Sequence, residues 1–283
     1  MLQFVSDSHD NQYVREQSSS LADLTAARAD TQRKHLLLAA SGSIVKALAK
    51  HADQLAIRIV LTDSARNFLN GQSSEQPTVS SLLHLPNVEA VYSDADEWGP
   101  QPWRRGASIL HIELRRWADI LVVAPLSANT LAKVCERPLP LFPHTSVPAI
   151  LKTRNNVQIV NGISDNLLTS VIRAWDTDTT IDNKKKVIVV APAMNSAMWR
   201  HPITAKQVRV LAEDWGVQGD GEPATIEAGS ATEATAPGQA TSGGWFQVIM
   251  PITKTLACGD TGDGAMASVD TIRATIEARL GLQ

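Results

Sequence analysis

Short apolar runs alternate with amphipathic stretches along most of the chain. Mainly apolar runs predict buried strands at 36–40, 57–61, 88–92, 120–124, 186–190 and 245–250. Helical periodicity fills the intervals, at 44–52, near 111–119, from 195 to about 215, and at 269–280. Apolar strands that alternate with helices predict a parallel sheet covered on both faces. We therefore expect an α/β protein with a doubly wound parallel sheet, in three layers α/β/α.

Polar turns of small residues follow four of the predicted strands, at 40–44, 62–64, 125–130 and 191–195. In parallel sheets, ligands bind beyond the carboxyl ends of the strands. Free backbone N–H groups at the start of the next helix favour anions there. Each turn alone is equally explained as a simple connection between elements. Because all four lie at the carboxyl ends of predicted strands, together they predict one phosphate-bearing ligand.

Three segments fall outside this pattern. Residues 1–33 are polar and predict a disordered tail, which leaves a single domain over 34–283. Residues 218–244 are a low-complexity insert rich in Gly, Ala, Thr and Glu, which predicts a disordered surface loop. Residues 134–158 interrupt what should be a short connection between helices, and long structureless loops are uncommon in compact domains.

Composition narrows the class of protein. The formal net charge of −3 and the absence of a basic block argue against a nucleic-acid partner. Two distant cysteines argue against a disulfide framework and favour a reducing compartment. The sequence shows neither a signal peptide nor an apolar run long enough for a membrane span. We expect a cytoplasmic protein without membrane or metal sites.

Residues 256–266 read Leu-Ala-Cys-Gly-Asp-Thr-Gly-Asp-Gly-Ala-Met and place three glycines within six residues. Glycine raises the entropy cost of ordering a helix or strand, so this stretch predicts a loop. Cys258 lies within it. A tight turn with a buried cysteine is the structural alternative, since free cysteine is often a small buried hydrophobe.

Several motifs together resemble one family. They are Ala-Ser-Gly-Ser, His-Ile-Glu-Leu-Arg-Arg-Trp-Ala-Asp, Ala-Pro-Leu-Ser-Ala-Asn-Thr, Asp-Asn-Leu-Leu-Thr, Pro-Ala-Met-Asn and Leu-Ala-Cys-Gly-Asp…Gly-Ala-Met. Outside the two inserts, residues 34–280 resemble the phosphopantothenoylcysteine decarboxylases, which belong to the homo-oligomeric flavin-containing cysteine decarboxylases. The last two motifs distinguish them from flavin prenyltransferases of the same fold.

The resemblance implies a flavodoxin-like (Rossmann-like) fold that binds FMN, in a homotrimer whose active sites are shared between neighbouring chains. It also implies decarboxylation of 4′-phosphopantothenoylcysteine to 4′-phosphopantetheine in coenzyme A biosynthesis. A cysteine carboxylate lacks an electron sink at its β position. Oxidation of the thiol by the flavin supplies that sink, and the enethiol product is then reduced.

The resemblance implies catalytic or substrate-binding roles for three residues. His111 resembles the base that takes a proton as hydride leaves for FMN; an exposed histidine at a helix start is its structural alternative. Cys258 resembles the proton donor to the enethiolate, on a flap over the substrate. Asn195 resembles the residue that holds the substrate carboxylate, and it is also a suitable N-cap for the following helix.

Further positions match by the same resemblance. Ala257 and Met266 match substrate-binding residues, while Thr255 stands where the family often has a basic residue, with Lys254 beside it. Phe68 is placed either near the flavin or in the core, and Gly42 is expected to allow close approach. The residues matched to FMN binding are Gly42, Ser43, Ile44, Thr62, Ser64, Phe68, Ser127, Ala128, Asn129, Thr130 and Ala193.

The segment 134–158 has no counterpart in the family. Removing it joins Lys133 to Ile159 and restores continuous family sequence. Val134-Cys135 can be encoded by GTATGT, a common intron start, Gln158 by CAG, an intron end, and the 25 residues keep the reading frame. We therefore predict a retained intron, which a spliced transcript that still carries these codons would contradict. A genuine lineage-specific loop is the alternative.

Three other functional interpretations remain open. Some fungal relatives are regulatory subunits that inhibit a type 1 protein phosphatase, but they usually end in a long acidic tail, whereas this chain stops at Gln283. An FMN decarboxylase acting on peptidyl cysteine is the second. A mixed trimer with a paralogue is the third. The presence of both His111 and Cys258 favours catalysis by a homotrimer.

Overall fold

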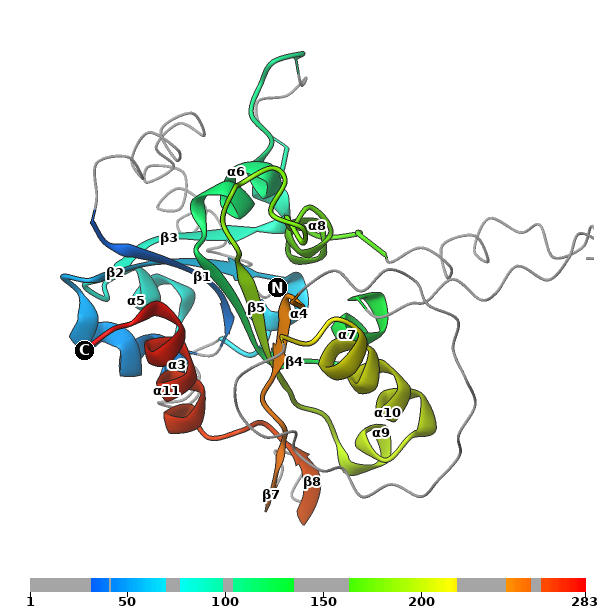
Figure 1. Ribbon diagram of the computed structural model, residues 1–283. Helices are drawn as coiled ribbons and strands as arrows, with labels where there is room; N and C mark the ends of the chain where they lie inside the picture. The colour runs from blue at the N-terminus through cyan, green and yellow to red at the C-terminus, as the bar shows by residue number, and fades with distance from the viewer. Residues whose placement is uncertain are drawn as a thin grey trace, which may run out of the picture.

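A computed structural model describes residues 32–40, 42–69, 77–98, 104–134, 163–217, 243–255 and 261–283. Within this part of the chain, six strands form one parallel sheet in the order β3-β2-β1-β4-β5-β6 (Figure 1). A separate antiparallel hairpin pairs β7 with β8. The strands are β1 (Lys34–Ala40), β2 (Leu55–Leu61), β3 (Val88–Ser93), β4 (Ile120–Leu126), β5 (Val187–Pro192), β6 (Phe246–Val248), β7 (Ile252–Thr255) and β8 (Thr261–Ala265).

The direction in which the sheet grows reverses between β1 and β4. The chain moves outward from β1 through β2 to β3, returns to β4 beside β1, and then continues to β5 and β6. Such a reversal opens a crevice at the carboxyl ends of the two central strands. This Rossmann-like order confirms the predicted α/β fold with a doubly wound parallel sheet.

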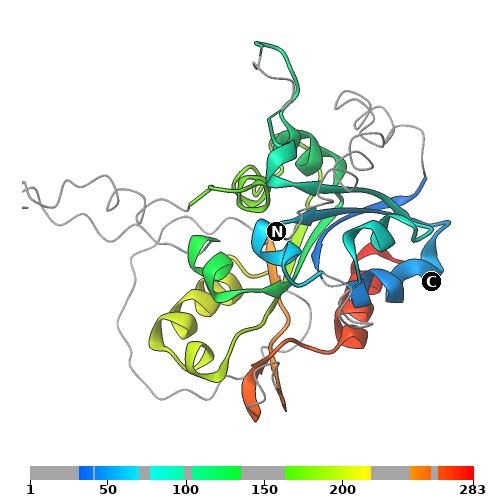
Figure 2. The same ribbon diagram turned by 180° about the vertical axis from the view of Figure 1, so that it is seen from behind.

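Helices cover both faces of the sheet (Figures 1 and 2). Helices α3, α5 and α11 share a buried cluster with Leu36 and Leu38 of β1, whereas α6, α7, α8 and α10 share the opposite cluster with Leu37. The alternation along β1 follows from the two-residue period of a strand. The bounds are α3 (Gly42–Leu48), α4 (Asp63–Arg66), α5 (Val79–Leu83), α6 (Leu110–Trp117), α7 (Ala128–Val134), α8 (Leu167–Arg173), α9 (Ser196–Trp199), α10 (Pro202–Arg209) and α11 (Val269–Leu280), with short turns η1 (Ala49–His51), η2 (Asp94–Asp96) and the π-type η4 (Val210–Asp214).

All six predicted sheet strands are confirmed, although their ends shift by up to two residues. The closing helix at 269–280 is confirmed with the predicted bounds, and its buried Ile272, Ile276 and Leu280 form the expected stripe. The predicted helix at 44–52 is present as α3 followed by η1.

The prediction of one long helix from 195 to about 215 is wrong. The chain forms α9, then α10, then η4. Pro202 begins α10, and His201 before it takes extended angles and accepts the N–H of Ile203 through its ring nitrogen at 3.2 Å. Proline disfavours helical angles in the residue that precedes it, so the break falls at His201.

The glycine-rich stretch is also not wholly a loop. Residues Thr261–Ala265 form β8, which pairs with β7, and Gly262 and Gly264 are buried there. Close approach of another backbone explains a glycine in a strand: a Cβ on Gly264 would lie 2.2 Å from the carbonyl oxygen of Met194.

The predicted tail and both predicted inserts lie largely outside the described residues, which omit 1–31, 135–162 and 218–242. The two ends of the segment between α7 and α8 are described, and they are adjacent. Ile163 donates its N–H to Lys133 O at 3.2 Å, and Lys133 Nζ lies 2.7 Å from Asp165 Oδ1. The described residues on either side of the segment therefore lie next to each other.

Candidate active site

Four polar turns lie along one edge of the sheet, because the strands that precede them are consecutive: β2, β1, β4 and β5. Ala40 of β1 is level with Ala124 of β4, and Ala193 after β5 donates its N–H to Leu126 O of β4 at 3.0 Å. This edge carries all the residues predicted for the cofactor, namely Gly42, Ser43, Ile44, Thr62, Ser64, Phe68, Ser127, Ala128, Asn129, Thr130 and Ala193.

The turn after β4 presents uncharged donors. Ser127 Oγ accepts the N–H of Thr130 at 3.2 Å and lies 3.1 Å from Thr130 Oγ1, and α7 begins between them at Ala128. Ser127 and Asn129 are exposed, and Thr130 is half-buried. Their hydroxyl and carboxamide groups are therefore accessible to a ligand at this edge.

The turn after β2 is built in the same way. Thr62 Oγ1 accepts the N–H of Ala65 at 3.2 Å and thereby caps the start of α4. Ser64 is exposed within α4. Helix α4 ends before Phe68, whose side chain is 68% exposed, so the alternative that placed Phe68 in the core is wrong.

Gly42 at the start of α3 is constrained by protein contacts rather than by open space. A Cβ at this position would lie 2.1 Å from Pro77 Cγ, so only glycine allows Pro77 to pack there. Ile44 is fully buried, so its side chain belongs to the core and only its backbone faces the turn. Ser43 is half-buried.

These residues fit a flavin mononucleotide. Hydroxyl groups and N–H groups at helix starts suit its phosphate. The exposed Phe68 ring offers apolar surface at the same edge. The crevice at the strand reversal is where doubly wound sheets bind nucleotide-like ligands.

The candidate substrate residues Asn195 and Met266 lie on segments that are bonded to each other. Met194 donates its N–H to Gly264 O at 2.9 Å, and Arg200 forms a bidentate ion pair with Asp263, with Nε 3.0 Å from Oδ2 and Nη2 3.2 Å from Oδ1. The turn that holds Asn195 is thus attached to β8. Ala257 and Cys258 lie outside the described residues, in the connection between β7 and β8.

His111 occupies the first turn of α6 and is paired with an acidic side chain. Its Nδ1 lies 2.8 Å from Glu97 Oε1, and the side chains of His111 and Glu97 are 19% and 10% exposed. The histidine is therefore held in place rather than free at a helix start. Sequence reasoning missed Glu97: it follows the predicted strand at 88–92, but a separation of 14 residues through a loop predicts no contact.

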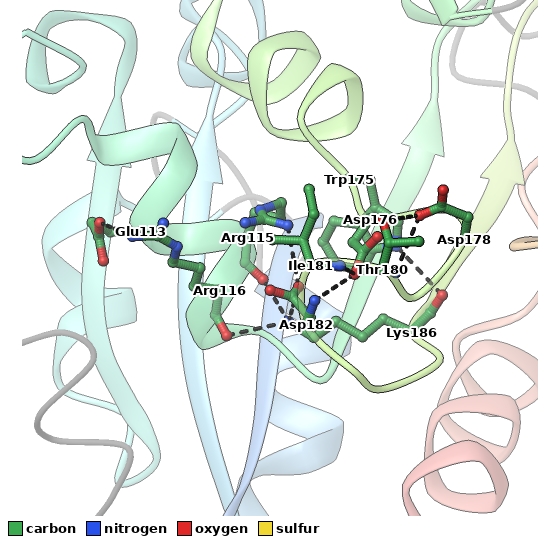
Figure 3. A network of polar contacts seen from close by, with 10 residues as sticks. All are labelled: Glu113, Arg115, Arg116, Trp175, Asp176, Asp178, Thr180, Ile181, Asp182 and Lys186. Carbon is green, nitrogen blue, oxygen red and sulfur yellow. Dashed lines mark hydrogen bonds and ion pairs between the residues drawn. The ribbon is translucent and has the colours of Figure 1, made fainter.

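The other end of α6 is fixed by a buried lysine (Figure 3). Lys186 Nζ donates to the carbonyl oxygens of Arg115 and Arg116 at 2.9 and 3.2 Å and lies 2.9 Å from Asp182 Oδ2. A cation at the carboxyl end of a helix donates hydrogen bonds to its last carbonyl groups and interacts favourably with the negative end of the helix dipole. Both ends of the helix that carries His111 are thus held.

One chain does not bring His111 together with Asn195 and Met266. In both views, α6 lies at the opposite end of the molecule from α9, β7 and β8 (Figures 1 and 2). Among the described residues, the predicted catalytic and substrate-binding residues therefore form two groups: His111 on α6, and Asn195 with Met266 near the turn after β5.

The comparisons with known proteins agree with this architecture. The Flavoprotein family matches residues 24–136 and 155–281, and the omitted residues lie within the segment predicted as an insert. A phosphopantothenoylcysteine decarboxylase of Arabidopsis thaliana is 35% identical, over 87% of this chain and 85% of the relative. That of Mus musculus is 36% identical, over 80% of this chain and 74% of the relative.

Solved structures show the same similarity. A cysteine-to-serine mutant of PPC decarboxylase, complexed with pantothenoylaminoethenethiol, is 32% identical with a TM-score of 0.55, over 87% of this chain and 97% of that chain. The FMN binding protein AtHal3 is 31% identical with a TM-score of 0.52, over 89% of this chain and 99% of that chain. The chain belongs to the Flavoprotein family and is related over most of its length to the phosphopantothenoylcysteine decarboxylases.

Proposed function

We propose that this protein binds FMN and decarboxylates 4′-phosphopantothenoylcysteine to 4′-phosphopantetheine, a carboxy-lyase step of coenzyme A biosynthesis in the cytoplasm. The observation that carries the proposal is the single edge formed by four neighbouring strands, where uncharged donors surround the strand reversal. The substrate follows from the relatives, which carry the name of this decarboxylase at 35–36% identity.

We assign cofactor binding, proton transfer and substrate binding to different residues. Ser127, Asn129, Thr130, Thr62 and the start of α3 would hold the cofactor. When bound, FMN supplies the two-electron redox chemistry that a cysteine decarboxylation needs. His111 takes the proton of the substrate thiol, and Asn195 holds the carboxylate that is lost as CO2. Cys258 gives the proton that completes the product.

We further propose a homotrimer with active sites between chains. The separation of α6 from the turn after β5 supports this assembly, because one chain alone leaves His111 away from Asn195 (Figures 1 and 2). In a cyclic assembly, the α6 group of one chain meets the Asn195 group of its neighbour.

The test is CO2 release by the purified, FMN-loaded protein from 4′-phosphopantothenoylcysteine. We expect yellow protein, one CO2 per phosphopantetheine formed, and accumulation of the unreduced enethiol in a Cys258→Ser variant. Flavin binding without any CO2 release would overturn the decarboxylase proposal and favour a regulatory flavoprotein.

A further inference from the structure

We propose that Glu97 is the positioning residue of His111, and this inference rests on the proposed function. Glu97 Oε1 lies 2.8 Å from His111 Nδ1, and both side chains are largely withdrawn from solvent. Within the described part of the chain, His111 is the one hydrogen-bonding partner of the Glu97 carboxylate. An ion pair on the protein surface differs in both respects, because its side chains are exposed to solvent and exchange partners freely.

The turn that precedes Glu97 is held by two other carboxylates, each with its own partner. Asp96 Oδ2 accepts the backbone N–H and the hydroxyl of Ser93, both at 2.7 Å. Asp94 Oδ1 accepts the N–H of Leu167 at 2.9 Å, which attaches the same turn to the start of α8. Glu97 directly follows η2, and its N–H is donated to Asp94 O at 3.3 Å. The carboxylate is therefore presented to α6 from a fixed turn.

The pairing decides which ring nitrogen of His111 can act as a base. An ionised carboxylate only accepts hydrogen bonds, so Nδ1 must carry the proton that is shared with Glu97. In the neutral imidazole, the free electron pair then resides on Nε2. Glu97 thus selects the tautomer and leaves Nε2 as the ring nitrogen that can accept a proton.

The same carboxylate supports the proton transfer. When the substrate S–H bond breaks and a new N–H bond forms at Nε2, the ring gains a positive charge. Glu97 offsets that charge from 2.8 Å without taking the proton itself. The imidazolium later releases the proton to water, so His111 returns to its starting form.

The experiment compares Glu97→Leu and Glu97→Gln in the FMN-loaded protein. Leucine removes the acceptor, whereas glutamine keeps a neutral oxygen that can still accept from Nδ1. Glu113→Gln is the matched control, because Glu113 is equally buried on α6 but pairs with Arg116 Nη1 at 3.0 Å. The readouts are FMN content, thermal stability, the rate of flavin reduction by the substrate, and the ¹⁵N spectrum of labelled histidine.

His111 is one of seven histidines, and its signals are assigned from their loss in His111→Ala. In the wild type, in Glu97→Gln and in the control, we expect the Nδ1–H tautomer. Glu97→Leu should show a mixture of tautomers, with flavin reduction slowed about 100-fold while FMN content is kept. Glu97→Gln should lose about 10-fold, since orientation remains without the charge.

A Glu97→Leu protein with the wild-type tautomer and a wild-type rate of flavin reduction would overturn the proposal. So would a protein that loses only thermal stability. The tautomer is read without turnover, so a wild-type protein that shows Nδ1–H but never reduces its flavin would refute the proposed function and support the pairing.

Discussion

The carboxamide of Asn195 can bond to the backbone and to a ligand at the same time. Its Oδ1 accepts the N–H of Met198 at 2.8 Å and caps α9, while the side chain stays exposed. Within the described part of the chain, the amide NH2 group has no hydrogen-bond partner, so it is available as a donor. Capping and carboxylate binding, which the sequence left as two roles, are therefore compatible in one side chain.

Asn195→Asp separates the two roles. Aspartate caps a helix as well as asparagine, so thermal stability should stay within the error of the wild type. The new negative charge faces the substrate carboxylate, and we expect kcat/KM for decarboxylation to fall more than about 10-fold. Asn195→Ser, which keeps the cap without the charge, is the control. Unchanged kcat/KM in Asn195→Asp would show that Asn195 does not hold the carboxylate.

At the scale of elements, α6 is a short helix whose position depends on contacts at both ends. Glu97 holds its first turn through His111, and Lys186 holds its last carbonyl groups from the segment before β5 (Figure 3). Lys186 is 1% exposed at its side chain, and Asp182 beside it also pairs with Arg115 at 3.3 Å. The geometry of His111 is thus coupled to a loop on the other side of the helix.

Lys186→Met tests that coupling. Methionine keeps much of the volume but leaves two carbonyl oxygens and Asp182 without their buried donor, so we expect the free energy of unfolding to fall by about 3 kcal/mol. Lys185→Met, at the exposed neighbouring residue, should change it by less than about 0.5 kcal/mol. Urea unfolding measures both. Equal losses in the two variants would contradict a capping role for Lys186.

Elements whose hydrophobic residues recur with a clear period could be predicted from the sequence. Elements whose bounds depend on tertiary contacts could not. The buried strands and α11 carry their own patterns. The break at His201 depends on one proline, and β8 was hidden because its glycines read as a loop, although Gly264 serves close approach to Met194. Glu97 and Lys186 could not be predicted either, since their contacts span 14 and about 70 residues. The four polar turns could be predicted because each directly follows a strand with a clear apolar pattern.

At the scale of the whole molecule, Asp119 joins the starts of three neighbouring strands. Its Oδ2 accepts the backbone N–H of His35 at 2.9 Å, and its Oδ1 lies 2.7 Å from Lys184 Nζ. Burial alone would raise the pKa of Asp119, but the hydrogen bonds from His35 and Lys184 outweigh it and hold the pKa well below its usual range.

This lowered pKa predicts acid sensitivity. The unfolded chain binds a proton at Asp119 before the folded protein does, so stability is complete above about pH 4 and is lost as the pH falls below that value. In Asp119→Asn, the free energy of unfolding should be lower at neutral pH and should depend less on pH below about 4. Asp53→Asn, an exposed loss of one charge, is the control. The same steep acid dependence in Asp119→Asn would contradict this assignment.

The segment between Lys133 and Ile163 can also be tested as a unit. Ile163 and Lys133 are already joined by a hydrogen bond of 3.2 Å, so the four residues 159–162 are enough to connect them after a deletion that removes only the last residue of α7. We expect deletion of 134–158 to preserve FMN binding and to raise the free energy of unfolding by about 1–2 kcal/mol, because the closed loop is shorter. Urea unfolding and the flavin spectrum measure this. A deletion variant that loses flavin or folding would show that the segment is needed.

The separation of α6 from the turn after β5 leads to the most direct measurement, which is CO2 release by a protein assembled from two inactive chains (Figures 1 and 2). His111→Ala and Cys258→Ser chains are co-expressed, and product formation from 4′-phosphopantothenoylcysteine is compared with each variant alone. A site shared between neighbours restores phosphopantetheine formation at about a quarter of the interfaces, because that share pairs an intact His111 with an intact Cys258. Activity no greater than that of the separate variants, beside an active wild type, would contradict the shared site.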